Sequence, residues 1–384
     1  MIKRILGLVC CLCLGFLPLA DMAERETQPG DGVRKILEEW RTSQREQAAK
    51  PPVRQMKAPG GIRLIWQNVF DSAINLAEQP PISGITVVSP CWFTIQDAAG
   101  TVVSAPKGRP DRSYTDKAHA KGYQVWALVT NADFDPEETG ALLANETGRR
   151  TAVRNLLALA KEYALDGINL DFENINLADR DRLTGFVQEI AAAARAEGLT
   201  VSMDVTFPGG SENWSQCYDR AALAKAVDYI AVMAYDEPGQ SSPEAGSVAS
   251  LAWVERGLQA TLDEVPPEKL LLGMPLYMRR WEEENGRLVK ASTLTMEEAR
   301  RLLTEKKPAR RWLPEAGQYY FEYHSGERLC RVWQEDARSL ALKATLVNRY
   351  NLAGAAFWRR GHETADIWPT VMAALDTAQA PWRE

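Results

Sequence analysis

Two acidic side chains, Asp171 and Glu173, end an alternating run of polar and apolar residues near the middle of the chain. Residues 166–173 read Asp-Gly-Ile-Asn-Leu-Asp-Phe-Glu. Because successive side chains of a β-strand point to opposite faces, Asn169, Asp171 and Glu173 share one face of the predicted strand. Neighbouring same-face positions lie roughly 6–7 Å apart, and like charges held that close raise the pKa of one carboxyl group. A protonated carboxyl group beside an ionised one suits acid catalysis on a glycosidic bond.

A regular alternation of short apolar runs and helical patterns surrounds this strand. Helical patterns occupy, for example, residues 150–163, 181–197 and 250–262. Strands that alternate with helices predict right-handed βαβ units and a parallel sheet. Eight such units over roughly 300 residues predict an α/β fold, the closed (β/α)8 TIM barrel. The predicted strands are residues 62–66, 85–89, 123–129, 167–172, 200–205, 229–234, 270–276 and 353–358.

The spacing between the seventh and eighth predicted strands departs from this rhythm. About 75 residues separate them, and residues 286–323 fit no single helix. We therefore expect a small insertion between strands seven and eight, at about residues 282–330, followed by a helix at about 335–350. The barrel itself is predicted to span residues 61–375.

The carboxyl ends of the predicted strands carry aromatic, acidic and amide side chains. Catalytic residues of such barrels lie at these ends. Aromatic faces stack on sugar rings and fixed polar groups orient hydroxyl and amide groups, so the rim predicts a saccharide cleft. Besides the acidic strand, the rim residues include Trp92, Met233, Tyr235, Asp236, Arg279 and Trp358.

These segments together resemble glycoside hydrolase family 18, which contains chitinases and N-acetylglucosaminidases. Residues 166–173 are similar to its DxxDxDxE signature, with Asn169 where the second Asp usually stands. Residues 233–236, Met-Ala-Tyr-Asp, resemble the sixth-strand motif, and Trp358 resembles the eighth-strand tryptophan. The resemblance covers about residues 61–370. Further segments resemble the bacterial branch linked to spore-cortex and cell-wall hydrolysis, namely 88–93, 125–128, 167–174, 242–249 and 352–358.

The resemblance implies a role for each catalytic residue. Glu173 would protonate the glycosidic oxygen, while the substrate's own 2-acetamido oxygen attacks the sugar. Asp171 would orient that acetamido group, Tyr235 would hydrogen-bond it, and Glu173 would then act as base for water. An Asp at position 169 could share a proton with Asp171, whereas Asn169 can only hydrogen-bond it. The residues expected to bind substrate are Asp166, Asn169, Trp92, Met233, Asp236, Arg279 and Trp358.

Two functions remain open at this point. One is a secreted hydrolase of β-1,4-linked N-acetylglucosamine polymers, either peptidoglycan or chitin. The other is a non-catalytic chitin- or peptidoglycan-binding protein on the same barrel. Because Glu173, Asp171 and Tyr235 are all present, we favour the enzyme. Asp236 and Arg279 fit either a substrate contact or a purely structural pair.

Composition restricts the partners further. The 384 residues carry a net charge of −6, with a pI near 5.5, which argues against nucleic acid as a partner. The three histidines, His119, His324 and His362, have no metal-ligand spacing. We expect no metal and no cofactor.

The N-terminus has the pattern of a secretory signal. A basic start, residues 1–4, precedes an apolar run over residues 5–20, so cleavage after Ala20 is expected. An uncleaved anchor is the alternative; after cleavage we expect no stable membrane insertion and a secreted or envelope-associated protein. Residues 21–60 read as a linker with a short amphipathic helix at about 32–45. The three cysteines beyond the signal form no disulfide framework.

Overall fold

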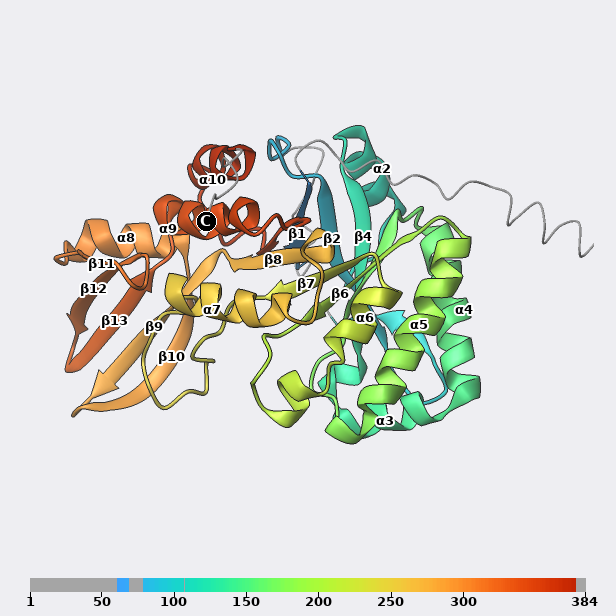
Figure 1. The fold of residues 1–384 in the computed structure, drawn as a ribbon. Helices are drawn as coiled ribbons and strands as arrows, with labels where there is room; N and C mark the ends of the chain where they lie inside the picture. Colours follow the sequence, from blue (N-terminus) through green and yellow to red (C-terminus); the bar gives the residue numbers. More distant parts are fainter. Residues whose placement is uncertain (1–60, 69–78, 107, 378–384) are drawn as a thin grey trace, which may run out of the picture. The chain divides into compact units, whose positions relative to one another are not determined.

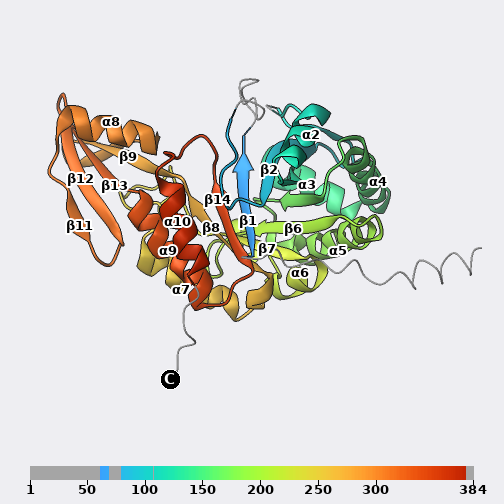
Figure 2. The same ribbon diagram turned by 90° about the horizontal axis from the view of Figure 1, so that it is seen from above.

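The computed structural model describes residues 61–68, 79–106 and 108–377. The predicted signal peptide and linker, residues 1–60, lie outside the described residues. Within the described ranges the chain forms a closed barrel of eight parallel strands, because β1 pairs with both β2 and β14 (Figures 1 and 2). Around the barrel the strands are β1 (Ile62–Gln67), β2 (Val87–Ile95), β4 (Gln124–Asn131), β5 (Gly167–Asp171), β6 (Thr200–Val205), β7 (Tyr229–Met233), β8 (Leu270–Pro275) and β14 (Gly354–Trp358). Each coincides with a predicted strand, which confirms the barrel.

Helices follow the strands and cover the outside of the barrel (Figure 2). They begin where the sequence supplies side-chain caps: Asp135 accepts hydrogen bonds from the amides of Glu137 and Glu138, and Pro136 occupies the first turn of α3. None of the helices in the described ranges is long and apolar enough to cross a membrane. The main helices are α2 (Arg112–Ala120), α3 (Pro136–Ala144), α4 (Glu146–Glu162), α5 (Arg180–Ala196), α6 (Arg220–Ala226), α7 (Leu251–Leu262), α9 (Ala337–Arg349) and α10 (Ile367–Asp376).

Two separate apolar clusters follow from the alternation of side chains along the strands. One lies between the strands and the helices, and the other fills the barrel interior. In the interior the Trp126 ring stacks on Tyr229, with ring centroids 5.7 Å apart. Gly167 is required beside this stack, because a Cβ there would lie 2.7 Å from Trp126 Cδ1. The filled interior leaves only the carboxyl ends of the strands for a site.

The insertion between β8 and β14 is larger than predicted. It is a five-stranded antiparallel sheet beside the barrel, in the order β10-β9-β13-β12-β11, with one helix (Figure 1). The prediction began too late because β9 follows β8 almost directly, and one apolar pattern runs through both strands. The elements are β9 (Tyr277–Glu284), β10 (Arg287–Thr295), α8 (Met296–Lys306), β11 (Arg311–Leu313), β12 (Gln318–Ser325) and β13 (Arg328–Gln334).

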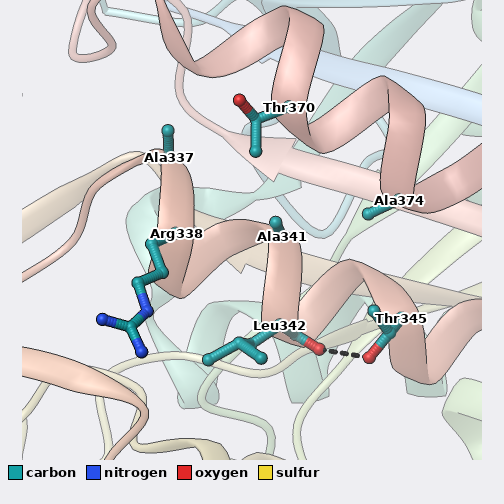
Figure 3. Close-up of a pocket in the computed structure, with 7 residues that line it drawn as sticks. All are labelled: Ala337, Arg338, Ala341, Leu342, Thr345, Thr370 and Ala374. Atoms are coloured by element: carbon teal, nitrogen blue, oxygen red, sulfur yellow. Dashed lines mark hydrogen bonds between the residues drawn. The ribbon is translucent and has the colours of Figure 1, made fainter.

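A surface groove lies between α9 and α10, away from the strand ends (Figure 3). Its volume is about 420 Å³. The lining is made of small or apolar side chains with one arginine, and it contains no acid and no histidine. Such a lining offers no catalytic chemistry. The lining residues are Ala337, Arg338, Ala341, Leu342, Thr345, Thr370 and Ala374.

Candidate active site

Strand β5 places its polar side chains inside the barrel and its apolar side chains against the helices, as the alternation predicts. Asn169 and Asp171 are buried, with 0% and 7% of their surface exposed. On the other face, the Phe172 ring stacks on Phe186 of α5 at 6.2 Å. Glu173 lies two residues beyond the end of the strand and is only partly buried. The two carboxyl groups therefore occupy the mouth of the barrel.

The backbone of Glu173 is held by a side chain from the neighbouring strand. The Glu173 amide donates to Oδ1 of Asn131 at 2.9 Å, and Nδ2 of Asn131 donates to the Glu173 carbonyl at 3.0 Å. Thr139 Oγ1 accepts a further hydrogen bond from the same Nδ2 at 2.9 Å. One residue earlier, the Tyr218 hydroxyl donates to the Phe172 carbonyl at 2.8 Å. The position of Glu173 is thus fixed from two other loops of the rim.

Burial raises the pKa values of Asp171 and Glu173, and repulsion by neighbouring carboxylates contributes at Glu173. Burial raises the pKa of Asp171 from its ordinary value of 3.8 to about 7. Burial also raises the pKa of Glu173 well above its ordinary value, and the charges of Asp171 and Asp236 raise it further. A partly buried Glu with a raised pKa is suited to act as a general acid.

One oxygen of Asp171 is left without a partner. Oδ1 is buried and accepts no hydrogen bond from any described residue. An unpaired buried carboxylate oxygen is costly, and such atoms in native structures usually have a functional reason. An incoming N–H or O–H group would satisfy it.

A second polar group lines the rim next to β7. The Tyr277 hydroxyl and Arg279 Nη2 both donate to Oδ1 of Asp236, at 2.5 and 2.6 Å. The Tyr235 ring packs edge-on against Tyr277, with centroids 6.4 Å apart. Arg279 is 5% exposed and Asp236 44% exposed at the side chain. In this ion pair Arg279 is buried, whereas the Asp236 side chain is exposed to solvent and can contact a ligand.

Apolar side chains complete the mouth of the barrel. Trp358, at the end of β14, is partly buried and packs edge-on against Trp66 with centroids 6.0 Å apart. Met233 is partly buried at the end of β7, on the same face as inward-pointing Ala231. Aromatic and thioether groups beside carboxyl groups give the amphipathic surface that a sugar ring needs.

Three residues predicted to bind substrate lie elsewhere. Asp166 begins the β5 segment at the opposite end of the barrel, where its Oδ2 accepts from the Val125 amide and contacts His119 Nε2, both at 2.8 Å. Asn169 is fully buried below Asp171 and binds only other side chains of the interior. Trp92 is fully buried in the outer cluster. These three positions are corrected to structural ones.

The displacement of Trp92 has a local cause in β2. The pairing of β2 with β4 shifts register between Cys91 and Phe93, so a bulge interrupts the alternation of faces. The Trp92 ring then packs edge-on against Tyr114 of α2 with centroids 5.2 Å apart. A simple count of alternating positions cannot reveal such a bulge.

Sequence reasoning also missed three members of the site, Asn131, Asp204 and Tyr277. All three stand at or near the ends of strands. Their partners could not be deduced, because each one acts on a residue from a different strand. No cluster of three or more His, Cys, Asp or Glu side chains in the described ranges could hold a metal ion.

The fold and the rim define a glycosidase built on a (β/α)8 barrel. The chain belongs to glycosyl hydrolase family 18, because the model of "Glycosyl hydrolases family 18" matches residues 77–363. Family membership, the barrel and the paired acids at the end of β5 agree with one another.

Several proteins with known sequences or structures are similar to the chain. The "Uncharacterized glycosylase YvbX" of Bacillus subtilis is 28% identical over 266 residues, which cover 66% of this chain and 76% of YvbX. The "Cortical fragment-lytic enzyme" of the same species is 26% identical over 281 residues, covering 72% of this chain and 65% of that enzyme. The chain thus spans slightly less than two thirds of the cortical enzyme.

Solved structures show the same architecture. A chitinase from Chromobacterium violaceum aligns with a TM-score of 0.74 and 26% identity, over 83% of this chain and 99% of that chain. The spore cortex-lytic enzyme SleL of Bacillus megaterium aligns with a TM-score of 0.73 and 22% identity, over 83% of this chain and 75% of that chain. Because the identity to SleL is only 22%, this similarity concerns the fold alone.

Proposed function

We propose that the protein hydrolyses β-1,4-linked glycans that contain N-acetylglucosamine, with retention of configuration and with the substrate's own acetamido group as nucleophile. The observation that carries this proposal is the buried Oδ1 of Asp171, which accepts no hydrogen bond from any described residue, two residues before Glu173, whose pKa burial raises well above its ordinary value. A 2-acetamido group supplies an N–H donor to the Asp171 carboxylate, whose oxygens each have two lone pairs and can accept a second hydrogen bond as well. This arrangement of the two acids fits the mechanism of glycosidases in which the substrate's own acetamido group assists the cleavage.

The mechanism divides the work between the two acids. Glu173 gives its proton to the glycosidic oxygen as the C1–O bond breaks, and the acetamido oxygen forms the new bond to C1. Asp171 accepts the acetamido N–H and its negative charge stabilises the positive oxazolinium ring. Glu173, now ionised, takes a proton from water as that water opens the ring. No protein carboxylate bonds to the sugar.

The remaining rim residues hold the substrate in this proposal. The Tyr235 hydroxyl hydrogen-bonds the acetamido oxygen, and the Trp358 ring lies under the sugar bound beside Glu173. Asp236 accepts from a sugar hydroxyl, since it is the exposed member of its pair with Arg279. Met233 provides an apolar contact at the same depth.

We infer that the natural polymer is a wall or chitin glycan. The similar proteins named above include a cortical fragment-lytic enzyme and a chitinase, and a further relative, 26% identical, is a di-N-acetylchitobiase of Rattus norvegicus. The signal-like N-terminus supports action outside the cytoplasm, either as a secreted or as an envelope-associated enzyme.

Product analysis on two polymers tests the proposal. Wild-type protein and Glu173→Gln are incubated with purified peptidoglycan and with chitin, and released ends and fragments are identified by mass spectrometry. We expect N-acetylglucosamine ends from at least one polymer with wild type, and none with Glu173→Gln. Equal inertness of the two proteins, with retained binding of the polymer, would support the non-catalytic binding protein instead.

A further inference from the structure

Asp204 lies next to Asp171 inside the barrel, on the adjacent strand. Strands β5 and β6 pair in parallel, with Asn169 opposite Ser202 and Leu170 opposite Met203. The next position in this register brings Asp171 beside Asp204, and neighbouring strands are about 4.8 Å apart. Asp204 is 2% exposed, so it is buried even more deeply than Asp171.

A fixed hydrogen-bond network holds one oxygen of Asp204. Trp66 Nε1 donates to Oδ1 of Asn169 at 2.7 Å, and Ser89 Oγ donates to the same atom at 3.2 Å. Because an indole N–H can only donate, the Asn169 amide cannot be turned around. Its Nδ2 therefore donates to Oδ1 of Asp204 at 2.8 Å.

Two buried carboxyl groups at this separation cannot both be ionised. One of them must keep a proton, and that proton needs an acceptor. The available acceptor is Oδ1 of Asp171, which is buried and has no partner among the described residues.

We propose that Asp204 is a positioning residue that keeps its proton and donates it, as a hydrogen bond, to Oδ1 of Asp171. The donated hydrogen bond favours the ionised form of Asp171, which the reaction needs, and fixes the orientation of its carboxylate. Asp204 thereby takes the place of an acid at position 169, moved to the neighbouring strand. This inference deepens the proposed function and rests on it for the role of Asp171 in the reaction.

The surroundings of Asp204 favour its neutral form. Burial raises the pKa of Asp204 well above its ordinary value, and the charges of Asp171 and Glu173 raise it further, while hydrogen bonding from Asn169 and Trp66 lowers it. The other titratable groups facing it, Tyr235 and Cys91, have pKa values raised by burial and stay neutral. Among the described residues, none of the groups that shift the pKa of Asp204 is a cation.

Two substitutions separate a neutral Asp204 from a charged one. Asp204→Asn keeps a neutral N–H donor, whereas Asp204→Ala removes the donor. If Asp204 is neutral, Asp204→Asn keeps kcat within about threefold, and Asp204→Ala lowers kcat about 10- to 100-fold. The acid limb of the kcat-against-pH profile moves to higher pH in Asp204→Ala only, because the ionised form of Asp171 loses its donor.

A charged Asp204 predicts the opposite shift. Removing a neighbouring negative charge would lower the pKa of Asp171, so the acid limb would move to lower pH in both variants. That result overturns the inference. An equal loss of kcat in Asp204→Asn and Asp204→Ala also overturns the inference. It would mean that the N–H group of Asn cannot replace the O–H group of Asp204.

A titration without substrate separates this inference from the proposed function. Carbon-13 NMR of the full-length protein labelled at Asp Cγ follows each carboxyl group, and the signal that is missing in Asp204→Asn is assigned to Asp204. We expect Asp204 to stay protonated while exposed aspartates titrate near their usual pKa of about 3.9. Titration of Asp204 together with the exposed aspartates overturns the inference even if the glycans are cleaved. A protonated Asp204 in a protein that cleaves none of them overturns the proposed function alone.

Discussion

Asn131 binds both the amide and the carbonyl of Glu173, at 2.9 and 3.0 Å, and so fixes the backbone of the residue that we propose as the general acid. These two hydrogen bonds connect the end of β4 to the residue that follows β5 by two positions. Asn131 itself is buried, with 1% of its surface exposed. General acid catalysis depends on the position of the acid relative to the leaving oxygen, and a small displacement costs much of the rate. Asn131 therefore acts through Glu173 without touching the substrate.

We predict that Asn131→Ala lowers kcat about 10- to 100-fold with little change in KM, because both hydrogen bonds to Glu173 are lost. Steady-state kinetics on an N-acetylglucosamine oligomer measures the effect. Asn348→Ala is a matched control: its Nδ2 also binds backbone carbonyls, those of Ala374, Leu375 and Thr377, but outside the barrel. The two variants should lose similar stability, and a similar loss of kcat in both would contradict a specific role for Asn131.

Asp171 is predicted to make the protein less stable as the pH rises. The folded protein holds the Asp171 proton up to about pH 7, whereas the unfolded chain releases it near its ordinary value of 3.8. Between these values folding takes up a proton, so the contribution of Asp171 to the free energy of unfolding falls with increasing pH. The full change corresponds to at most about 4 kcal/mol.

The variant Asp171→Asn removes this dependence. We expect it to unfold with a larger free energy than wild type at pH 8 and with a similar one at pH 4, measured by urea denaturation. Glu173→Gln serves as the comparison. Burial also raises the pKa of Glu173, but this side chain lies nearer to solvent. An Asp171→Asn protein that is less stable than wild type at pH 8 would contradict a raised pKa of Asp171 in the folded protein.

The sequence predicted the fold well because the fold depends on repeated local patterns. Eight apolar runs with helical patterns between them have few solutions other than a barrel, and β5 was recognised from alternation alone. The pairing inside the site was not predictable, since Asn131, Asp204 and Tyr277 contact residues from other strands. Trp92 and Asp166 were misplaced for different reasons: a bulge moved the first, and the second lies at the amino end of its strand.

Asn169 shows how a contact from another strand changes an interpretation. The sequence predicted a hydrogen bond between Asn169 and Asp171, whereas the amide donates to Asp204. An acid at position 169 would therefore face Asp204 as well, and the interior would hold a third carboxyl group.

We predict that Asn169→Asp is destabilised by about 3 kcal/mol at pH 8 and by less at pH 5. The pKa of the new acid is raised in the folded state, so its penalty grows as the pH rises above the value in the unfolded chain. Urea denaturation at the two pH values measures the difference. The kcat-against-pH profile should shift as well, and a profile identical to that of wild type would show that position 169 is not coupled to Asp171.

A buried ion pair fixes α9 beside the insertion. Nζ of Lys343 lies 2.8 Å from Oε1 of Glu335, and both side chains are 0% exposed. Gln318 of β12 also donates to Glu335, at 2.5 Å. We predict that Lys343→Met lowers the free energy of unfolding by about 3–5 kcal/mol, because it leaves a buried carboxylate without a cation.

The double variant Lys343→Met with Glu335→Gln is the control for this pair. It removes both charges, so most of the lost stability should return, as thermal or urea unfolding will show. A double variant no more stable than Lys343→Met would mean that packing around Lys343, and not its charge, carries the effect.

The central claim is that the acetamido group of the substrate performs the attack while Glu173 supplies the proton. Its most direct test compares initial rates on two chromogenic β-1,4-linked oligomers of equal length, one of N-acetylglucosamine and one of glucose. We predict rapid release of the chromophore from the N-acetylglucosamine oligomer by wild type, no detectable release from the glucose oligomer, and at least a thousandfold loss with Glu173→Gln. Comparable rates on the two oligomers, or an active Glu173→Gln, would contradict the account.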